Sequence, residues 1–402
     1  MKIGINGYEA VVPRFGYDQK TGLPRRVGSG EYCYRLLLNL NRIDKKNDYT
    51  IYLPTFPSPD FPPESENWHY KIIGKKTIWT LFDLSFYFFK KREKPDVFFS
   101  PTHYLPLFTP FPCAISILDL SYLKYPLLFK KRDLYQLKIW SKFSINKSKR
   151  VFTISNSSRN DIIKTYQLPE EKVVVTYPGI KSVSSIKPFG PELRVEGYKA
   201  LSMDKITKRY GIDGEYVLFV GTLQPRKNIG KLIEAFSKVL TLNSQLSRLA
   251  AKRATLSLAI VGKKGWQYEE ILDAPKKFGV EGRVKFLENV TDEDLPTFYK
   301  NALCFVLPSL YEGFGLPILE AMQNGCPVIT SNVSSLPEAG GDAAIYINPQ
   351  DVDDIAQKLE KVIKDDKLRK EMIKKGYEQV KKFSWEKTAK ETLRALEEIY
   401  EG

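Results

Sequence analysis

Residues 303–322 of the chain read LCFVLPSLYEGFGLPILEAM. The first five residues form a short apolar run without polar alternation, which predicts a buried strand. Gly313 and Gly315 then permit a tight turn and a close approach of the backbone to a ligand. Pro317 suits the first turn of a helix, and Gly325 suits the position just past its end. The stretch therefore predicts a strand, a glycine-rich turn and a helix in succession.

Two carboxylates bracket this turn. Glu312 precedes the glycines, and Glu320 lies roughly 6 Å along the helix axis from Leu316. The N–H groups and the positive dipole end at a helix start favour an anion, whereas carboxylates accept hydrogen bonds from hydroxyl groups. The pattern fits a ligand with both phosphate and hydroxyl groups, and we expect a nucleotide sugar. The turn residues expected to contact it are Gly313, Phe314, Gly315 and Leu316.

Strands and helices alternate along the rest of the chain in two series. With 402 residues and 43% hydrophobic content, the chain is long enough for two domains with full cores. We expect two doubly wound, Rossmann-like α/β domains with a ligand cleft between them. The predicted domains are 1–180 and 216–382, joined by a linker over 181–215 and followed by a C-terminal helix over 383–402. We expect this last helix to pack back on the first domain.

The expected elements are the following. Strands are predicted over 2–6, 49–53, 97–99, 115–118, 151–154 and 172–175, and then over 217–220, 256–261, 284–287, 303–307 and 327–330. Helices are predicted from residue 32, near residues 228, 268, 292 and 316, and over 351–364.

A second phosphate candidate follows the strand at 217–220, where residues 221–228 read GTLQPRKN. Arg226 and Lys227 stand at the carboxyl end of a parallel strand, where the ligand crevice of such sheets opens. Arginine grips phosphates with a planar fork and lysine adds a point charge. Asn228 would cap the next helix. A basic pair before a helix is often plain surface charge, but this position favours a diphosphate site.

Taken together, these motifs resemble those of the retaining glycosyltransferases of family 4, which have the GT-B fold of two Rossmann-like domains facing each other across a cleft. Seven residues separate Glu312 from Glu320, as in that family's motif. The likeness covers nearly all of residues 215–390 and is looser over 1–180. The strings VGTL at 220–223, SLYEGFG at 309–315 and SLPE at 335–338 are similar to bacterial mannosyl- and rhamnosyltransferase-like members.

The resemblance implies roles for the second domain, which would bind the nucleotide sugar. Arg226 and Lys227 would hold the donor diphosphate. Thr222 stands where many members carry an arginine, so the charge there would fall to Arg226. Glu320 would accept hydrogen bonds from ribose hydroxyls and Glu312 from sugar hydroxyls, while Val290 would contact the base. GDP-mannose is favoured over UDP sugars as the donor.

The resemblance also assigns the first domain to the acceptor, a glycan or lipid-linked glycan of surface polysaccharide biosynthesis. The loop of Gly28, Ser29 and Gly30 would face the donor diphosphate. Asp119 follows an apolar strand and is open to two interpretations, a helix cap or a catalytic residue, because Leu118 replaces the histidine common in relatives. His103 is either an acceptor contact or an ordinary loop residue.

The expected reaction is the retaining transfer of a hexosyl group by front-face attack, with Glu312, Arg226, Lys227 and Asp119 as the catalytic candidates. No Asp-x-Asp triad follows a strand, so we expect no metal ion, and we expect no cofactor. Two rival functions remain open. One is a phosphorylase or epimerase on the same architecture, and the other is a non-catalytic basic protein.

Positive charge is concentrated at the N-terminal end. The net charge is +15, and residues 1–150 hold 25 Lys and Arg against 13 Asp and Glu. Basic residues alternate with aromatic ones over 75–92 and 125–140, which favours an anionic membrane surface. A solvated basic face is the alternative, and nucleic acid is not expected as a partner. The chain starts with a strand-like segment instead of a signal peptide, and its four cysteines suit a reducing compartment. We expect a cytoplasmic protein at the inner face of the plasma membrane.

Overall fold

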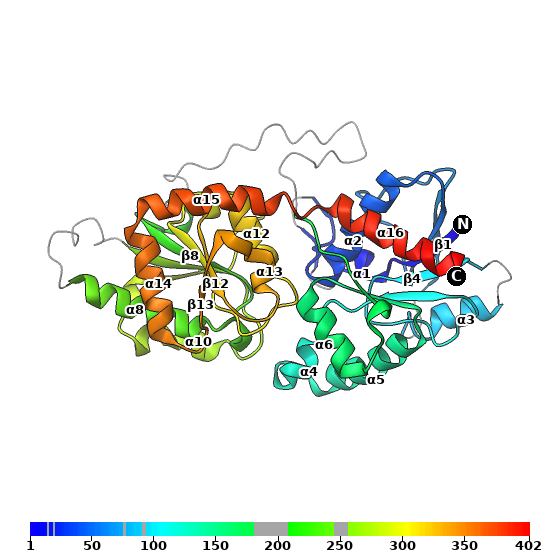
Figure 1. Cartoon of the computed structure of the whole chain (residues 1–402), viewed down its shortest axis with the longest axis horizontal. Helices are drawn as coiled ribbons and strands as arrows, with labels where there is room; N and C mark the ends of the chain where they lie inside the picture. The colour runs from blue at the N-terminus through cyan, green and yellow to red at the C-terminus, as the bar shows by residue number, and fades with distance from the viewer. Residues whose placement is uncertain (14–15, 19–20, 75–77, 91–93, 181–207, 245–255) are drawn as a thin grey trace. The chain divides into compact units, whose positions relative to one another are not determined.

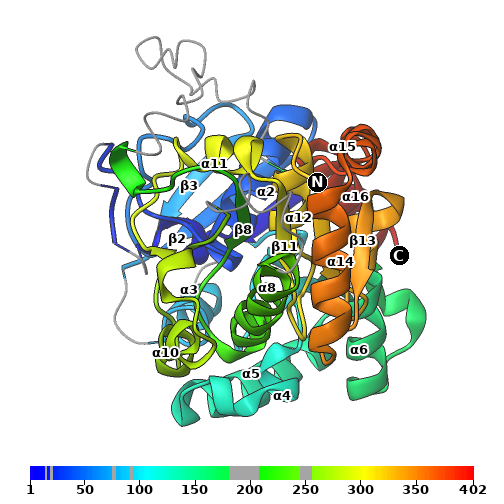
Figure 2. The same cartoon turned by 90° about the vertical axis from the view of Figure 1, so that its left-hand side faces the viewer.

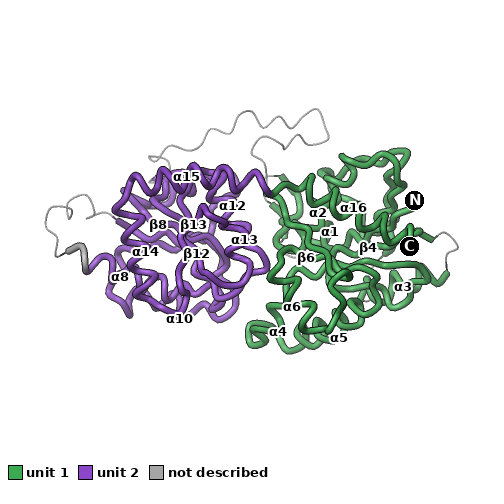
Figure 3. Tube along the Cα trace, in the orientation of Figure 1, with its two compact units in different colours: residues 1–196, 383–402 green, residues 197–382 purple. Residues whose placement is uncertain are grey.

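The computed structural model describes residues 1–402 except 14–15, 19–20, 75–77, 91–93, 181–207 and 245–255. The chain forms two compact units, residues 1–196 with 383–402 and residues 197–382 (Figure 3). Each unit has a parallel sheet with helices on both faces (Figure 1), as predicted. Most of the predicted linker, residues 181–215, lies outside the described residues.

Unit 1 contains a 7-stranded sheet in the order β3-β2-β1-β4-β5-β6-β7. Its strands are β1 (Lys2–Asn6), β2 (Asp48–Leu53), β3 (Trp68–Ile72), β4 (Val97–Ser100), β5 (Cys113–Ser116), β6 (Arg150–Thr153) and β7 (Val173–Val175). Its described helices are α1 (Tyr8–Val11), α2 (Ser29–Ile43), α3 (Asp83–Lys90), α4 (Ser121–Lys124), η1 (Pro126–Leu128), α5 (Lys131–Lys147), α6 (Asn156–Tyr166), η2 (Glu170–Lys172) and α16 (Trp385–Glu401).

The two faces of this sheet have separate cores, because side chains alternate along a strand. In β4, Val97 and Phe99 belong to the core shared with α2 and α16. Phe98 between them belongs to the other core, which includes residues of α3, α5 and α6.

The C-terminal helix α16 completes the first of these cores. It lies beside α2 (Figure 1), and the ring of Trp385 contacts that of Tyr32 at a centroid distance of 5.9 Å. Thr388 donates a hydrogen bond to the carbonyl oxygen of Tyr177 at 2.5 Å. A Cβ atom at Gly179 would lie 2.1 Å from the backbone nitrogen of Trp385, so only glycine permits this approach. The predicted packing of this helix on the first domain is confirmed.

Unit 2 contains a 6-stranded sheet in the order β10-β9-β8-β11-β12-β13. Its strands are β8 (Tyr216–Val220), β9 (Ser257–Val261), β10 (Val284–Leu287), β11 (Cys304–Leu307), β12 (Val328–Ser331) and β13 (Ala344–Ile347). Its described helices are η3 (Pro225–Lys227), α8 (Ile229–Ser244), α10 (Glu269–Lys277), η4 (Glu281–Arg283), α11 (Leu295–Asn301), α12 (Leu316–Gln323), α13 (Leu336–Gly340), η5 (Gly341–Ala343), α14 (Val352–Lys364) and α15 (Asp366–Val380). Figure 2 shows α8 beside α14, which contacts it.

The strand order of unit 2 fixes where a ligand would bind. The chain starts in the middle of the sheet with β8, moves outward to β10, and then returns to the other side of β8 with β11. In such a sheet the crevice opens at the carboxyl ends of the two strands where the order reverses. Here those strands are β8 and β11, and they are followed by Arg226–Lys227 and by the glycine-rich turn.

Several elements differ from the prediction. The strands β3 and β13 and the helix α15 were not predicted. The β3 sequence, WHYKI, mixes charged with aromatic residues, and the α15 sequence is mostly charged and polar. The β13 sequence, AIYI, is a short apolar run that the prediction missed. The helix α2 begins at Ser29 and not at Tyr32, because Gly28 adopts φ 56° and its carbonyl oxygen accepts the N–H of Tyr32.

The cap predicted at Asn228 has a different role. Asn228 does precede α8, but its backbone is left-handed with φ 57°, unlike the extended backbone typical of a cap. Its side-chain amide donates hydrogen bonds to the carbonyl oxygens of Pro308 at 3.2 Å and Pro349 at 2.7 Å. Asn228 therefore ties the loops after β11 and β13 to the start of α8.

Within the described part of the chain, no helix combines the length and the apolar character needed to cross a bilayer.

Candidate active site

The glycine-rich turn and α12 have the predicted geometry. Gly315 precedes α12 with φ 108°, and a Cβ atom there would lie 3.0 Å from Leu336 Cδ2. Pro317 lies in the first turn of the helix. The N–H of Gly325 donates to Met322 O at 3.1 Å, and the next N–H donates to Ala321 O at 2.9 Å. These two bonds form the glycine C-cap that the sequence predicted.

Glu312, Arg226 and Lys227 form one buried cluster. Glu312 is only 8% exposed. Its Oε2 accepts a hydrogen bond from Arg226 Nη1 at 2.7 Å, and its Oε1 accepts one from Lys227 Nζ at 2.5 Å. Arg226 also donates to the carbonyl oxygen of Tyr311. Three residues predicted from two separate motifs are thus in direct contact, and together they carry one net positive charge.

The electrostatics of the cluster keep Glu312 ionised. Burial by itself would raise the pKa of this carboxyl group. The charges of Lys227 and Arg226 outweigh that effect and lower the pKa to about 2, from 4.5. Glu312 therefore remains a carboxylate throughout the physiological range, and it can accept hydrogen bonds but cannot donate a proton.

The backbone of Glu312 is held by two serines that the sequence prediction missed. Its carbonyl oxygen accepts hydrogen bonds from the hydroxyls of Ser334 at 2.6 Å and Ser335 at 2.8 Å. Ser334 adopts φ 59°, which is uncommon for a residue with a side chain. Both serines follow β12, the strand beside β11. Their place at the carboxyl edge of the sheet is the signal that could have identified them.

Glu320 extends from the second turn of α12 and is half-buried. Its Oε2 accepts a hydrogen bond from the hydroxyl of Tyr299 at 3.1 Å. Tyr299 is 1% exposed, and burial, followed by the charge of Glu320, raises its pKa well above the usual value. Tyr299 therefore acts as a neutral donor that fixes the position of the Glu320 carboxylate. Nothing in the sequence pattern indicated this role.

The remaining candidates of unit 2 lie at the same edge of the sheet. Thr222 is exposed just after β8, and Val290 is half-buried between β10 and α11. The acidic residues near Val290 have other partners. Glu288 forms an ion pair with Lys264 at 2.8 Å, and Asp294 accepts hydrogen bonds from Arg209 and Tyr210.

In unit 1, the Gly28–Gly30 segment starts α2 instead of forming a free loop. The hydroxyl of Ser29 donates to Glu9 Oε2 at 3.2 Å. A Cβ atom at Gly30 would lie 3.0 Å from the carbonyl oxygen of Glu9. The helix start is therefore packed closely against α1, with Gly28 exposed.

Asp119 and His103 have local partners. Asp119 Oδ1 accepts the N–H of Ser121 at 2.8 Å, at the start of α4. The N-cap position of α4 is Leu120, which makes no side-chain cap hydrogen bond, so Asp119 forms a local turn contact one residue before the cap. Both interpretations of Asp119, a cap and a catalytic residue, stay predictions. The His103 ring lies against the rings of Tyr104 and Tyr122, at centroid distances of 6.4 and 6.1 Å.

No group of three or more His, Cys, Asp or Glu side chains with the arrangement of a metal site occurs among the described residues.

Two family models match the chain. The model of glycosyl transferases group 1 matches residues 202–379, and that of glycosyltransferase family 4 matches residues 28–182. The first covers most of unit 2 and the second most of the sheet of unit 1.

Curated relatives agree with these matches. O-antigen chain mannosyltransferase B of Escherichia coli is 36% identical over 253 residues, which are 63% of this chain and 61% of that protein. The serotype-specific mannosyltransferase WbdA of Escherichia coli is 34% identical over 240 residues, 60% of this chain and 27% of that protein. The matched region thus spans less than two thirds of the length of these relatives.

Solved structures show the same fold. WaaG, a glycosyltransferase involved in lipopolysaccharide biosynthesis, has a TM-score of 0.65 and 16% identity, with 100% of both chains covered. Anabaena HepE in complex with UDP and glucose has a TM-score of 0.68 and 16% identity, covering 99% of this chain and 100% of that one.

The two family matches, the mannosyltransferase relatives and the fold neighbours agree with the family that the sequence resembles. The chain belongs to the family 4 glycosyltransferases.

Proposed function

We propose that the protein transfers a hexosyl residue from a nucleotide-diphosphate sugar to a saccharide or lipid-linked saccharide, with retention of anomeric configuration and without a metal ion. The observation that carries this proposal is the buried cluster of Glu312, Arg226 and Lys227 at the strand-order reversal of unit 2, directly beside the start of α12.

The charges of this cluster suit the leaving group. As the bond from the anomeric carbon to the diphosphate oxygen breaks, negative charge grows on that oxygen. Arg226, Lys227 and the start of α12 stabilise this charge more than they stabilise the bound donor, which lowers the barrier. The acceptor oxygen forms the new bond on the same face of the sugar, and its proton passes to the departing phosphate.

The two glutamates bind different parts of the donor. Glu312 keeps Arg226 and Lys227 in place and has lone pairs left for sugar hydroxyls. Glu320, fixed by Tyr299, accepts hydrogen bonds from the ribose. The turn residues 313–316 and Gly28–Gly30 contact the diphosphate, while Thr222 and Val290 lie near the nucleotide. Asp119 and His103 belong to the acceptor side in unit 1.

The names of the relatives support a narrower choice of substrate. Two of them are O-antigen or serotype-specific mannosyltransferases of Escherichia coli. We therefore favour GDP-mannose as the donor and a growing surface polysaccharide as the acceptor.

The exposed surface of unit 1 supports a cytoplasmic enzyme that binds the inner face of the membrane. Phe82, Phe86 and Phe89 share one face at and beside α3, and Phe89 is 71% exposed. The ring of Phe89 contacts that of Phe108 at 5.6 Å, and Lys90 Nζ lies 4.2 Å from the centre of the Phe86 ring. Residues 75–77 and 91–92 of the predicted segment 75–92 lie outside the described residues.

A second exposed basic and apolar segment lies on the same side of the sheet. Leu127 in η1 is 82% exposed, and Tyr135 and Ile139 of α5 are also exposed. Lys130, Lys131, Arg132 and Lys138 are exposed around them. Residues of α3 and α5 pack on the same core, so the two segments lie on the same side of the sheet. Their exposed basic and apolar side chains suit an anionic lipid surface. Nucleic acid is not proposed as a partner.

A ligand screen tests the donor. Thermal-shift measurements compare GDP, UDP and TDP sugars. The true donor should raise the unfolding midpoint of the protein, because a ligand that binds only the folded state stabilises it. Nuclear magnetic resonance of the product should show the anomeric configuration of the donor, with unchanged rates in EDTA. Inversion, or release of sugar phosphate without an acceptor, would exclude the proposal.

Substitution of Glu320 tests the nucleotide contact. Glu320→Ala should weaken nucleotide binding by roughly 1.5–3 kcal/mol, because ribose hydroxyls lose a charged acceptor. Calorimetric titration measures this directly, and an unchanged donor affinity would contradict the assigned role.

A further inference from the structure

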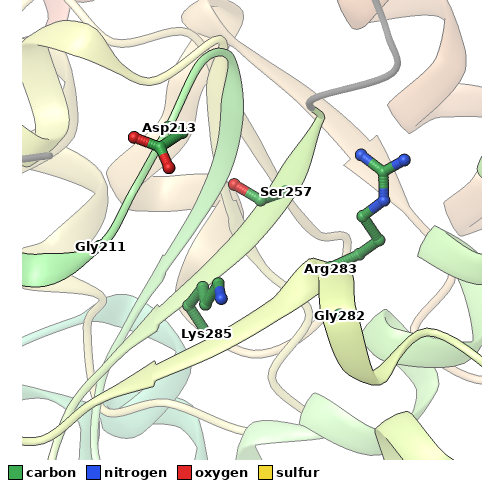
Figure 4. A pocket seen from close by; sticks show the side chains of 6 residues that line it. All are labelled: Gly211, Asp213, Ser257, Gly282, Arg283 and Lys285. Atoms are coloured by element: carbon green, nitrogen blue, oxygen red, sulfur yellow. The ribbon is translucent and has the colours of Figure 1, made fainter.

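A small polar pocket lies at the opposite edge of the unit 2 sheet from the candidate active site (Figure 4). It has a volume of about 220 Å³ and is lined by Gly211, Asp213, Ser257, Gly282, Arg283 and Lys285. Ser257 is the first residue of β9, and Arg283 immediately precedes β10. The pocket therefore sits at the amino ends of the strands, whereas the Glu312 cluster follows their carboxyl ends.

The strand register places the polar side chains of this pocket together. Leu258 of β9 pairs with Val284 of β10, and Ala259 pairs with Lys285. Because side chains alternate along a strand, Ser257 lies on the same face of the sheet as Arg283 and Lys285. Figure 4 shows Ser257 and Lys285 on neighbouring strands, with Arg283 and Asp213 on either side.

The two cations in the pocket have no carboxylate partner in the described part of the chain. Among the described residues, the guanidinium of Arg283 donates one long hydrogen bond, to the carbonyl oxygen of Leu256 at 3.4 Å. Neither Arg283 nor Lys285 forms an ion pair with any described residue, in contrast to Arg226 and Lys227. Two unpaired basic groups beside a concave surface attract an anion.

The hydroxyl of Ser257 provides an independent indication of a ligand. Ser257 is 6% exposed, and its Oγ has no hydrogen-bond partner among the described residues. Buried hydroxyls are nearly always hydrogen-bonded in folded proteins. An oxygen-rich ligand between Arg283 and Lys285 would satisfy this group.

We propose that this pocket binds the phosphate group of a small ligand. The guanidinium of Arg283 would hold two phosphate oxygens, Lys285 would add a point charge, and the hydroxyl of Ser257 would donate a hydrogen bond. The volume is below the roughly 300–1,000 Å³ of drug-sized sites, which restricts the ligand to a small molecule. Asp213 supplies an acceptor for a hydroxyl group, as a sugar phosphate would require.

The site is distinct from the donor site because the two lie at opposite edges of one sheet. Occupation of the pocket would link β9 and β10 through a shared anion. A phosphorylated metabolite could then stabilise unit 2 without occupying the position of the nucleotide sugar.

Calorimetric titration with inorganic phosphate tests the proposal on the intact protein. The wild type should bind phosphate, and both Arg283→Gln and Lys285→Gln should weaken binding by about tenfold or more, since each removes a charged hydrogen bond. Ser257→Ala should weaken binding by about fivefold at unchanged charge. Should Arg283→Gln fail to fold, the Lys285 and Ser257 variants carry the test.

Two control variants separate this pocket from other basic surface. Lys370→Gln removes an exposed positive charge on α15. Arg226→Gln removes a half-buried positive charge at the edge of the sheet where the donor is proposed to bind. Both should leave phosphate binding at the pocket unchanged. The proposal would be overturned if the wild type did not bind phosphate, or if Lys370→Gln weakened phosphate binding as much as the pocket variants do. It would also be overturned if Arg226→Gln abolished phosphate binding while Arg283→Gln left it unchanged.

A second titration, with a hexose 6-phosphate, distinguishes a sugar phosphate from free phosphate as the ligand of the pocket. Tighter binding than that of inorganic phosphate, lost in Asp213→Asn, identifies a sugar phosphate. Equal affinities identify free phosphate. Both measurements use the protein without donor or acceptor, so they stand apart from the outcome of the transfer assay.

Discussion

The hydroxyl of Tyr299 donates a hydrogen bond of 3.1 Å to Oε2 of Glu320. This contact joins the buried interior of α11 to a half-exposed carboxylate of α12.

Tyr299→Phe should therefore affect donor binding more than catalysis. Without the hydroxyl, the Glu320 side chain is free to adopt other rotamers, and the donor KM should rise about fivefold, equivalent to about 1 kcal/mol, with a smaller change in kcat. Steady-state kinetics over a range of donor concentrations measures this split.

Tyr216→Phe is the matched control. Tyr216 is equally buried, and its hydroxyl donates to the carbonyl oxygen of Phe298 at 2.8 Å. The variant should lose similar stability without a change in donor KM. A similar rise in KM in both variants would mean that Tyr299 acts only through packing.

The ion cluster of Glu312 should make stability depend on pH. Its folded pKa of about 2 lies below the ordinary value of 4.5, so the unfolded state binds more protons between these values. The cluster then contributes about 3 kcal/mol above pH 4.5, and this contribution is lost as the pH falls towards 2. Glu312→Gln should remove the contribution, so the difference from the wild type should shrink across this window.

Urea unfolding at a series of pH values measures this difference. Glu371→Gln, an exposed glutamate of α15, should parallel the wild type at every pH. A constant difference between Glu312→Gln and the wild type from pH 6 to pH 2 would show that the charge of Glu312 does not couple to Arg226 and Lys227.

The turn before α12 should tolerate only glycine at position 315. Gly315→Ala places a side chain at φ 108° and 3.0 Å from Leu336 Cδ2, which should cost about 1–3 kcal/mol of unfolding free energy. At Gly230, in the first turn of α8, an added Cβ atom would meet open space, and the backbone has no positive φ. Gly230→Ala should be neutral or stabilising, and a similar loss in both variants would contradict the explanation.

The aromatic surface of α3 should determine membrane binding. Phe86→Ser combined with Phe89→Ser should lower the affinity for anionic vesicles by at least about tenfold, since each buried phenyl ring contributes roughly 1.5–3 kcal/mol. Phe56→Ser, at another exposed site of unit 1, should have no effect. Co-sedimentation with vesicles at low and high salt tests this, and binding that is absent in the wild type or indifferent to salt would exclude the surface.

The sequence predicted the features that depend on local pattern. The strand, turn and helix around Gly315 follow from apolar runs, glycine and proline within a few residues of one another. The doubly wound sheets follow from the repetition of such units.

Contacts between distant segments could not be predicted in the same way. The bonds from Arg226 and Lys227 to Glu312 depend on β8 and β11 being neighbours, although β9 and β10 separate them in sequence. In the sequence, Tyr299 cannot be distinguished from an ordinary core residue, because its role depends on a single hydrogen bond from its hydroxyl group to Glu320. At Asn228, the residue type predicted a helix cap, but the left-handed backbone directs the side-chain amide to the carbonyl oxygens of Pro308 and Pro349 instead.

The position of α16 has a consequence for synthesis on the ribosome. The sheet of unit 1 is translated first, yet one of its two cores needs Trp385, Ala389 and Leu396 from the last helix. Unit 2, by contrast, is continuous in sequence and is fully translated before α16. An N-terminal domain usually folds first during synthesis, but this core of unit 1 cannot be completed until translation reaches α16, when all of unit 2 has already been synthesised.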